Sequence, residues 1–142
     1  MKKKKIQHLE MIEHIIKRMG HNSFLLKGWS ITLISAFVAL VSKGKREYFF
    51  VLAFIPLLAF WFLDAFYLMT ERKYRMLYEN VRVSKKVNFS MDPDVVTYTG
   101  KQCKKICFMS CLFSKTEILF YGFLAFIICG LTIFWNFFSL AS

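Results

Sequence analysis

The sequence predicts an all-α integral membrane protein with three transmembrane helices, an N-terminal amphipathic helix and a cytoplasmic helical extension. Apolar residues make up 56% of the 142 residues, whereas a soluble domain is about 45–50% apolar. Most of the 17 Phe residues lie in three apolar runs. Each run is about as long as a helix that crosses a bilayer, which needs roughly 17–25 mostly apolar residues.

Residues 1–22 predict an amphipathic helix on the cytoplasmic side. Its apolar residues recur at three- and four-residue steps, the spacing of one helix face. They are Ile6, Leu9, Ile12, Ile15, Ile16 and Met19. Two interpretations remain open: the helix lies on the inner leaflet, or it packs against other copies or the internal loop. Gly20, His21 and Asn22 are expected to interrupt or bend this helix before the first span.

Residues 23–70 predict a transmembrane hairpin with spans at about 24–42 and 48–69. The first span contains Lys27 near its edge, where a long side chain can extend to the membrane surface. The second span contains one charged residue, Asp64. Because backbone groups in lipid must be hydrogen-bonded internally, both runs should be helical.

The remaining chain predicts a cytoplasmic helix and loop at 71–116 and a third transmembrane helix within 117–142. The stretch from Glu71 to Asn80 lacks Gly and Pro and is rich in helix formers, so the second span should continue as a helix into the cytoplasm. A short helix is expected from Lys101 to Lys115. The run from Ile118 to Leu140 carries no charge.

The distribution of basic residues predicts the orientation. Of the 20 Lys and Arg residues, 17 lie before the first span, at its leading edge (Lys27) or between the second and third spans, and 3 lie in the hairpin. Basic residues favour the cytoplasmic side. The N-terminus and the internal loop should therefore be cytoplasmic at a bacterial inner membrane, and the C-terminus periplasmic or extracellular. The net charge of +11 is explained by topology and lipid, so nucleic acid is not expected as a partner.

Lys27 and Asp64 are expected to form an intramembrane ion pair. Spans one and two are joined by a short connection and should pack antiparallel, and the two residues lie at similar depths. Charged residues inside a membrane usually pair or face water. Two interpretations stay open: the pair fixes the register of the hairpin, or it lines a water path.

Small and polar residues form a seam on each of two spans, within about 40° of a common line on the first. The members are Gly28, Thr32, Ser35, Ala39 and Ser42 on span one, and Gly122, Ala125, Cys129, Thr132 and Asn136 on span three. Small residues let membrane helices approach closely. The seams therefore predict helix packing and a homo-oligomer, with pore lining as the alternative.

No cofactor, metal site or enzymatic activity is expected. Cys103, Cys107 and Cys111 recur every four residues, which differs from the usual spacing of zinc and iron–sulfur ligands. A nucleophile with its base, or a glycine-rich phosphate loop, is not visible in the sequence. We therefore predict no catalytic residues and no metal-binding residues.

Two segments carry a resemblance to a known family. The segment FLLKGWS enters span one, and FWFLDAFYLMTERKYRMLYENVR leads out of span two as a long helix. Together with the amphipathic helix, this arrangement resembles the SLATT-like small membrane effectors and accessory membrane proteins of bacterial anti-phage conflict systems, over about Ile6 to Val83. Typical members have two spans, whereas this chain has a third.

The resemblance implies a homo-oligomer that permeabilises the inner membrane, working with a cytoplasmic protein partner from a defence operon. The expected function is a membrane-disrupting or pore-forming component, with membrane lipid as its surroundings. The alternative is a passive anchor that recruits a soluble partner through loop 71–116.

Overall fold

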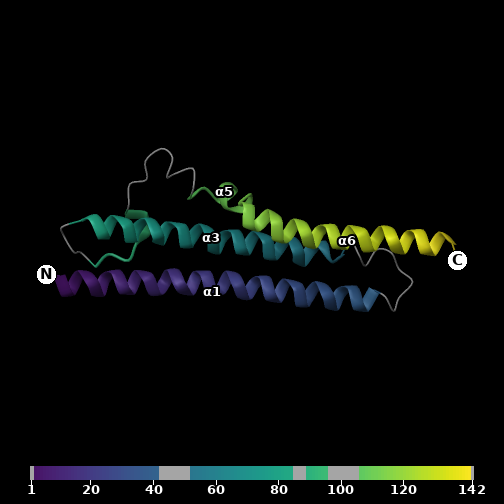
Figure 1. Cartoon of the computed structure of the whole chain (residues 1–142), viewed down its shortest axis with the longest axis horizontal. Helices are drawn as coiled ribbons and strands as arrows, with labels where there is room; N and C mark the ends of the chain where they lie inside the picture. The colour runs from purple at the N-terminus through teal and green to yellow at the C-terminus, as the bar shows by residue number, and fades with distance from the viewer. Residues whose placement is uncertain (1, 42–51, 85–88, 96–105, 142) are drawn as a thin grey trace. The chain divides into compact units, whose positions relative to one another are not determined.

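The computed structural model describes residues 2–41, 52–84, 89–95 and 106–141 (Figure 1). Its regular structure over these residues is helical, without strands, which confirms the all-α prediction. Three helices are long and apolar enough to cross a membrane, as predicted. They are α1 (Lys2–Val41), α3 (Phe54–Val83) and α6 (Lys115–Ala141).

Two short helices complete the described structure. A 3-10 turn, η1, covers Pro93–Val95, and α5 covers Phe108–Leu112. The helix expected from Lys101 to Lys115 is only partly present. Residues 101–105 lie outside the described part, and a turn at 113–114 separates α5 from α6. The chain turns there because α5 ends at Leu112, whose carbonyl oxygen accepts a hydrogen bond from Trp61.

The expected interruption at Gly20, His21 and Asn22 is wrong, because α1 passes through these residues without a break. A single glycine costs a helix only about 1 kcal/mol, and tertiary packing offsets that cost. A Cβ atom at Gly20 would lie 3.7 Å from Glu71 Oε2. The glycine therefore lies where a side chain of α3 approaches α1.

The chain forms two compact units. Unit 1 consists of Met1–Phe24 and Ala65–Cys111, and unit 2 of Leu25–Asp64 and Leu112–Ser142. Because α1 and α3 are long, each contributes to both units.

Unit 1 has its own apolar core, formed by Ile12, Leu77 and Val81. Polar contacts fasten the end of α3 to α1: Lys5 Nζ donates to the carbonyl oxygens of Arg82 and Ser84, at 2.8 Å each. Lysine at a helix C-terminus satisfies carbonyl groups that lack an intrahelical donor. The core and this cap together hold the first half of α1 against the second half of α3.

A short segment after α3 also packs on α1 within unit 1. His8 is fully buried, and its Nε2 atom lies 3.0 Å from the carbonyl oxygen of Ser90. The His8 ring faces the ring of Phe89 at 5.3 Å between centroids. An ion pair of 2.7 Å between Lys73 and Asp94 holds η1 to α3.

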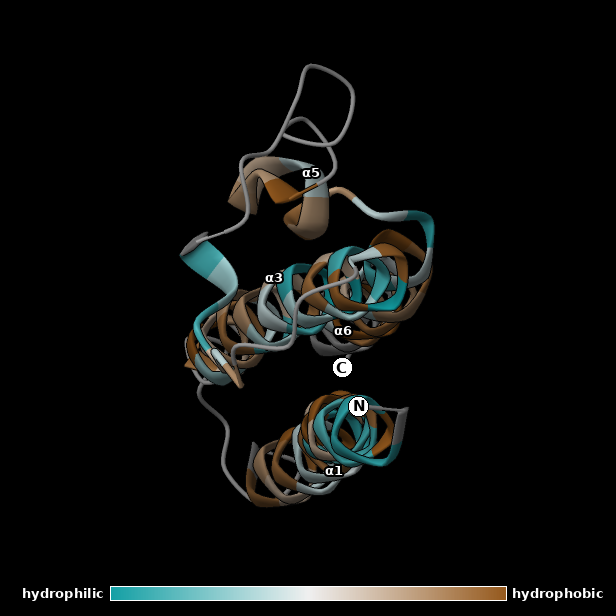
Figure 2. Ribbon diagram, turned by 90° about the vertical axis from the view of Figure 1, so that its left-hand side faces the viewer, coloured by the Kyte–Doolittle hydropathy of each residue, from teal (hydrophilic) through white to brown (hydrophobic). Residues whose placement is uncertain are grey.

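Unit 2 has an apolar core formed by α1, α3 and α6. Its buried members are Ile34, Ala53, Leu57, Tyr121, Leu124 and Ile128. Large hydrophobic side chains of this unit also remain on the surface, including Leu119 and Phe126, each more than 70% exposed. Hydrophobic residues accordingly occur on several sides of the helices (Figure 2). A surface of this kind suits a lipid environment or further protein contacts.

Candidate functional site

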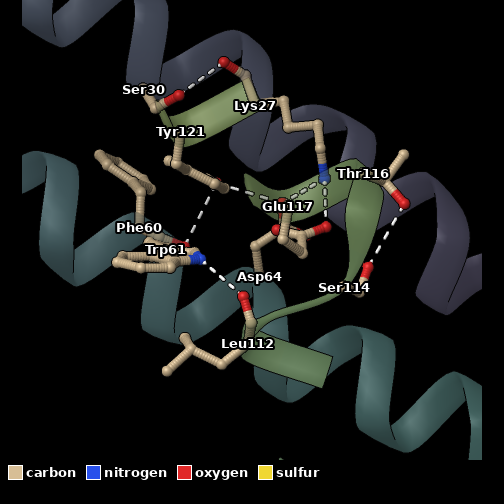
Figure 3. A network of polar contacts seen from close by, with 10 residues as sticks. All are labelled: Lys27, Ser30, Phe60, Trp61, Asp64, Leu112, Ser114, Thr116, Glu117 and Tyr121. Carbon is tan, nitrogen blue, oxygen red and sulfur yellow. Dashed lines mark hydrogen bonds and ion pairs between the residues drawn. The ribbon is translucent and has the colours of Figure 1, made fainter. Parts of the chain in front are cut away.

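A buried polar cluster lies among the three long helices of unit 2 (Figure 3). Lys27 comes from α1, Asp64 from α3 and Glu117 from the first turn of α6. Lys27 Nζ forms ion pairs with Asp64 Oδ2 and with Glu117 Oε1, the second at 3.1 Å. One ammonium group thus joins all three helices.

Both carboxyl groups are removed from solvent. Asp64 is 0% exposed and Glu117 is 2% exposed, whereas the Lys27 side chain keeps 20% of its surface. The long stem of Lys27 runs along apolar surface, and its ammonium lies 5.8 Å from the centre of the Phe120 ring. A lysine in this position can reach an acidic partner without losing all contact with the surroundings.

The hydroxyl group of Tyr121 also contacts Asp64. It lies 3.1 Å from Asp64 Oδ2 and 3.3 Å from the carbonyl oxygen of Phe60, and it can donate its one proton to either. Tyr121 and Glu117 are four residues apart on α6 and therefore share a face. The same face continues with the buried residues Leu124 and Ile128.

Neighbouring side chains fix the shape of the cluster. The Trp61 indole donates to the carbonyl oxygen of Leu112 at 3.1 Å, and its ring stacks on Tyr121 at 6.3 Å. The Ser30 hydroxyl is fully buried and donates to the carbonyl oxygen of Lys27 at 2.8 Å. These contacts hold the cluster on helical backbone, which positions groups more rigidly than loops do.

Glu117 Oε2 is a polar atom of the cluster without a hydrogen-bond donor among the described residues. It is buried there. Leaving a buried polar group unsatisfied costs roughly 1–3 kcal/mol, and more when the group is charged. Glu117 is therefore the member of the cluster whose environment satisfies it least.

The structure brings Lys27 and Asp64 together and places the two seams elsewhere. On α1, the seam residues Gly28, Thr32, Ser35 and Ala39 are exposed, and Ser42 lies outside the described residues. On α6, Gly122 and Cys129 are exposed, Ala125 and Thr132 are half-buried, and the side chain of Asn136 is not described. Within unit 2, α6 packs instead through the face of Glu117, Tyr121, Leu124 and Ile128.

Sequence reasoning missed Glu117, Tyr121 and Trp61. The uncharged run of the third span begins at Ile118. Glu117 directly precedes this run, so a search for uncharged residues does not select it. Two signals could have found it. Glu117 lies at the edge of its span that is predicted to be on the same membrane side as Lys27 and Asp64, and it is four residues from Tyr121, the spacing of one helix face.

The structure describes two of the three cysteines that recur every four residues. Cys107 is exposed in a bend before α5, Cys111 is buried in α5, and both have free thiols. Cys103 lies outside the described residues. In the part of the chain that the structure describes, no group of three or more His, Cys, Asp or Glu residues could hold a metal ion.

Comparisons with protein-family models, curated proteins and solved structures found no match to this chain.

Proposed function

We propose that this chain is a homo-oligomeric protein of the bacterial inner membrane and serves as the membrane-disrupting or pore-forming component of an anti-phage defence system. The N-terminus and loop 71–116 face the cytoplasm in this proposal, and the C-terminus faces the periplasm or the exterior. A cytoplasmic protein of the same operon supplies the activating signal.

The observation that carries the proposal is the buried cluster of Lys27, Asp64 and Glu117. Each of these residues lies on one of the three helices that are apolar enough to cross a membrane. Placing a charged side chain at the centre of a membrane helix costs roughly 2.5–3.5 kcal/mol on insertion scales. Ionisable residues in such helices commonly mark paths for ions or protons.

The seam of α1 supports assembly with other copies. Four of its small or polar residues are exposed in unit 2, so they are open to a neighbouring helix. Ser35 and Ala39 also line a groove of about 340 Å³, together with Leu124 and Leu131 of α6. A helix from a second copy fits this groove, because small residues allow close backbone approach in a membrane.

Support for the defence role comes from the resemblance of the segment from Ile6 to Val83 to SLATT-like membrane effectors. The described helices include the long continuous α3, which carries apolar residues at its start and the basic stretch after Glu71 at its end. This arrangement suits a membrane component with a cytoplasmic helical part.

A passive anchor is the second candidate, and unit 1 favours it. This unit has its own apolar core and an open groove of about 650 Å³, lined by Met11, His14, Phe89 and Met91 among others. Such a groove suits an apolar segment of a soluble partner. In this alternative the three helices only hold unit 1 at the membrane.

Flux measurements separate the two candidates. Purified protein is reconstituted into vesicles that contain an anionic lipid and a trapped fluorescent dye, with a potassium-loaded set for ion flux. The pore proposal expects dye release or potassium flux that rises with the protein-to-lipid ratio. Asp64→Asn should reduce the flux, whereas Glu79→Gln, at an exposed carboxylate paired with Arg82, should not. Inserted protein that passes neither dye nor ions, alone or with its operon partner, would favour the anchor.

A further inference from the structure

The buried polar cluster contains more acidic than basic groups. Within the described residues, Lys27 contributes one positive charge, and Asp64 and Glu117 can contribute two negative charges. An uncompensated charge in a low-dielectric environment is strongly unfavourable. The cluster therefore needs one further positive charge to be neutral.

We propose that Asp64 and Glu117 together bind a single proton, and that this cluster is the proton-binding site of the permeation path. The second half of this inference rests on the function proposed above. Lys27 Nζ contacts one oxygen of Asp64 and one oxygen of Glu117, the second at 3.1 Å, so the two buried carboxyl groups lie beside the same ammonium.

The contacts of each carboxyl group place the proton on Glu117. Asp64 Oδ2 is bonded to Lys27 and to Tyr121, and donors of this kind stabilise the ionised form. Glu117 Oε1 accepts from Lys27, but Oε2 is buried without a partner. A proton on Oε2 removes the charge from the carboxyl group whose second oxygen has no hydrogen-bond donor among the described residues.

A proton fits the site better than a metal cation. The ammonium of Lys27 already contacts both carboxyl groups and would repel a second cation at the same oxygens. In the described part of the chain, further polar groups at the cluster include the hydroxyl of Ser30 from α1, the carbonyl oxygen of Phe60 from α3 and the hydroxyl of Tyr121 from α6. These three groups carry no positive charge.

Proton loss changes the charge of the cluster from zero to minus one. The neutral carboxylic acid of Glu117 becomes a carboxylate, its proton leaves to water, and the new negative charge repels the carboxylate of Asp64. The three helices are joined at this point, so their contact weakens. Proton binding and release at Glu117 is thus the step that couples proton concentration to permeation.

Infrared spectroscopy tests the proton directly, because a protonated carboxyl group has a carbonyl stretch that a carboxylate lacks. The full-length protein in vesicles is measured at neutral pH, together with Glu117→Gln and Asp64→Asn. Glu79→Gln is the matched control, since its carboxylate is exposed. We expect the wild type and the control to show a band equal to one protonated carboxyl group per chain, and both cluster variants to lose it.

The wild type alone also tests the proposal if the variants do not fold. Protein labelled with ¹³C in the carboxyl group of Glu, and separately of Asp, should shift the band only with the Glu label. Absence of the band at neutral pH, its persistence in both cluster variants, or a shift only with the Asp label would overturn the proposal. Disappearance of the band on adding sodium at constant pH would identify a metal cation instead of a proton.

The same vesicles distinguish failure of the proton site from failure of the proposed function. A pH-sensitive dye inside them reports proton flux. The infrared band without any flux would retain the proton site and overturn the permeation role. Flux without the band would retain the permeation role and overturn the proton site.

Discussion

The phenol hydroxyl of Tyr121 on α6 lies 3.1 Å from Oδ2 of Asp64 on α3, and both side chains are buried. Asp64 Oδ2 also accepts from Lys27 on α1. A single carboxylate oxygen therefore receives donors from the two other long helices. Asp64 of α3 is therefore the residue at which side chains from α1 and α6 meet in the polar cluster.

Removing the Tyr121 hydroxyl should weaken unit 2 without changing its packing. Tyr121→Phe keeps the ring and deletes the donor to Asp64 and Phe60. Loss of a hydrogen bond to a buried charged group should lower the free energy of unfolding by about 1–3 kcal/mol. Thermal unfolding in detergent measures the change, with Tyr67→Phe in unit 1 as the control. Equal losses in the two variants would contradict a specific role for the Tyr121 hydroxyl.

The Lys27–Asp64 ion pair should show strong coupling in a double-mutant cycle. Lys27→Ala and Asp64→Ala should each lower folded yield, because removing one partner of a buried pair costs up to about 3–5 kcal/mol. The double variant should recover part of the loss, because neither partner of the pair is then left as a lone buried charge. Unfolding free energies in detergent measure the cycle. Strict additivity of the two single effects would show that the residues act independently.

The α1 seam should control assembly. Ser35→Phe and Ala39→Phe place a bulky ring where close helix approach is expected, so both should shift native mass spectra in detergent from oligomer to monomer. Leu33→Phe changes an exposed apolar residue outside the seam and serves as the control. A monomeric wild type, or oligomers unaffected by both seam substitutions and by Ala125→Phe, would exclude seam-mediated assembly.

Reporter fusions should reveal the proposed orientation. A reporter that is active only outside the cytoplasm should work after Ser142, and one that is active only inside should work after Asn88. The reason is the distribution of basic residues, with 17 on the proposed cytoplasmic side and 3 on the opposite side. A cytoplasmic C-terminus would mean that one of the three spans does not cross.

Gly20→Ala should stabilise the protein. Glycine weakens a helix, whereas alanine is the best helix former. The substitution should therefore raise the free energy of unfolding by about 0.5–1 kcal/mol. The added methyl group would lie 3.7 Å from Glu71 Oε2, an ordinary contact. A higher unfolding temperature in detergent is expected, and Gly20→Val, which is bulkier and β-branched, should lose the gain. A lower temperature for Gly20→Ala would indicate that α1 needs to bend at this point.

The sequence was sufficient for the features that depend on hydrophobic length and charge. Apolar runs predicted three long helices, and matching depths in neighbouring spans suggested the contact between Lys27 and Asp64. Glu117 was missed because a search for uncharged runs excludes a charge at the first turn of a helix. Its burial depends on the way α6 packs beside Asp64, which no local pattern encodes.

Glycine at position 20 misled for a related reason. Helix propensities describe residues of isolated helices in water, whereas Gly20 lies beside Glu71 of another helix. Local sequence patterns also do not predict that α5 is only five residues long. It ends at Leu112, whose carbonyl oxygen is satisfied by Trp61, a residue 51 positions earlier in the chain.

The order of synthesis gives the shared ammonium of Lys27 a further consequence. Lys27 emerges from the ribosome first, Asp64 follows 37 residues later, and Glu117 follows after 90. For a chain inserted as it is translated, the first helix brings a lysine to the translocon before either acidic partner exists. The first two helices would then enter lipid together, as a pair with matched charges. In such a chain Glu117 would be synthesised last. It would form its ion pair with Lys27 of a hairpin that has already left the translocon.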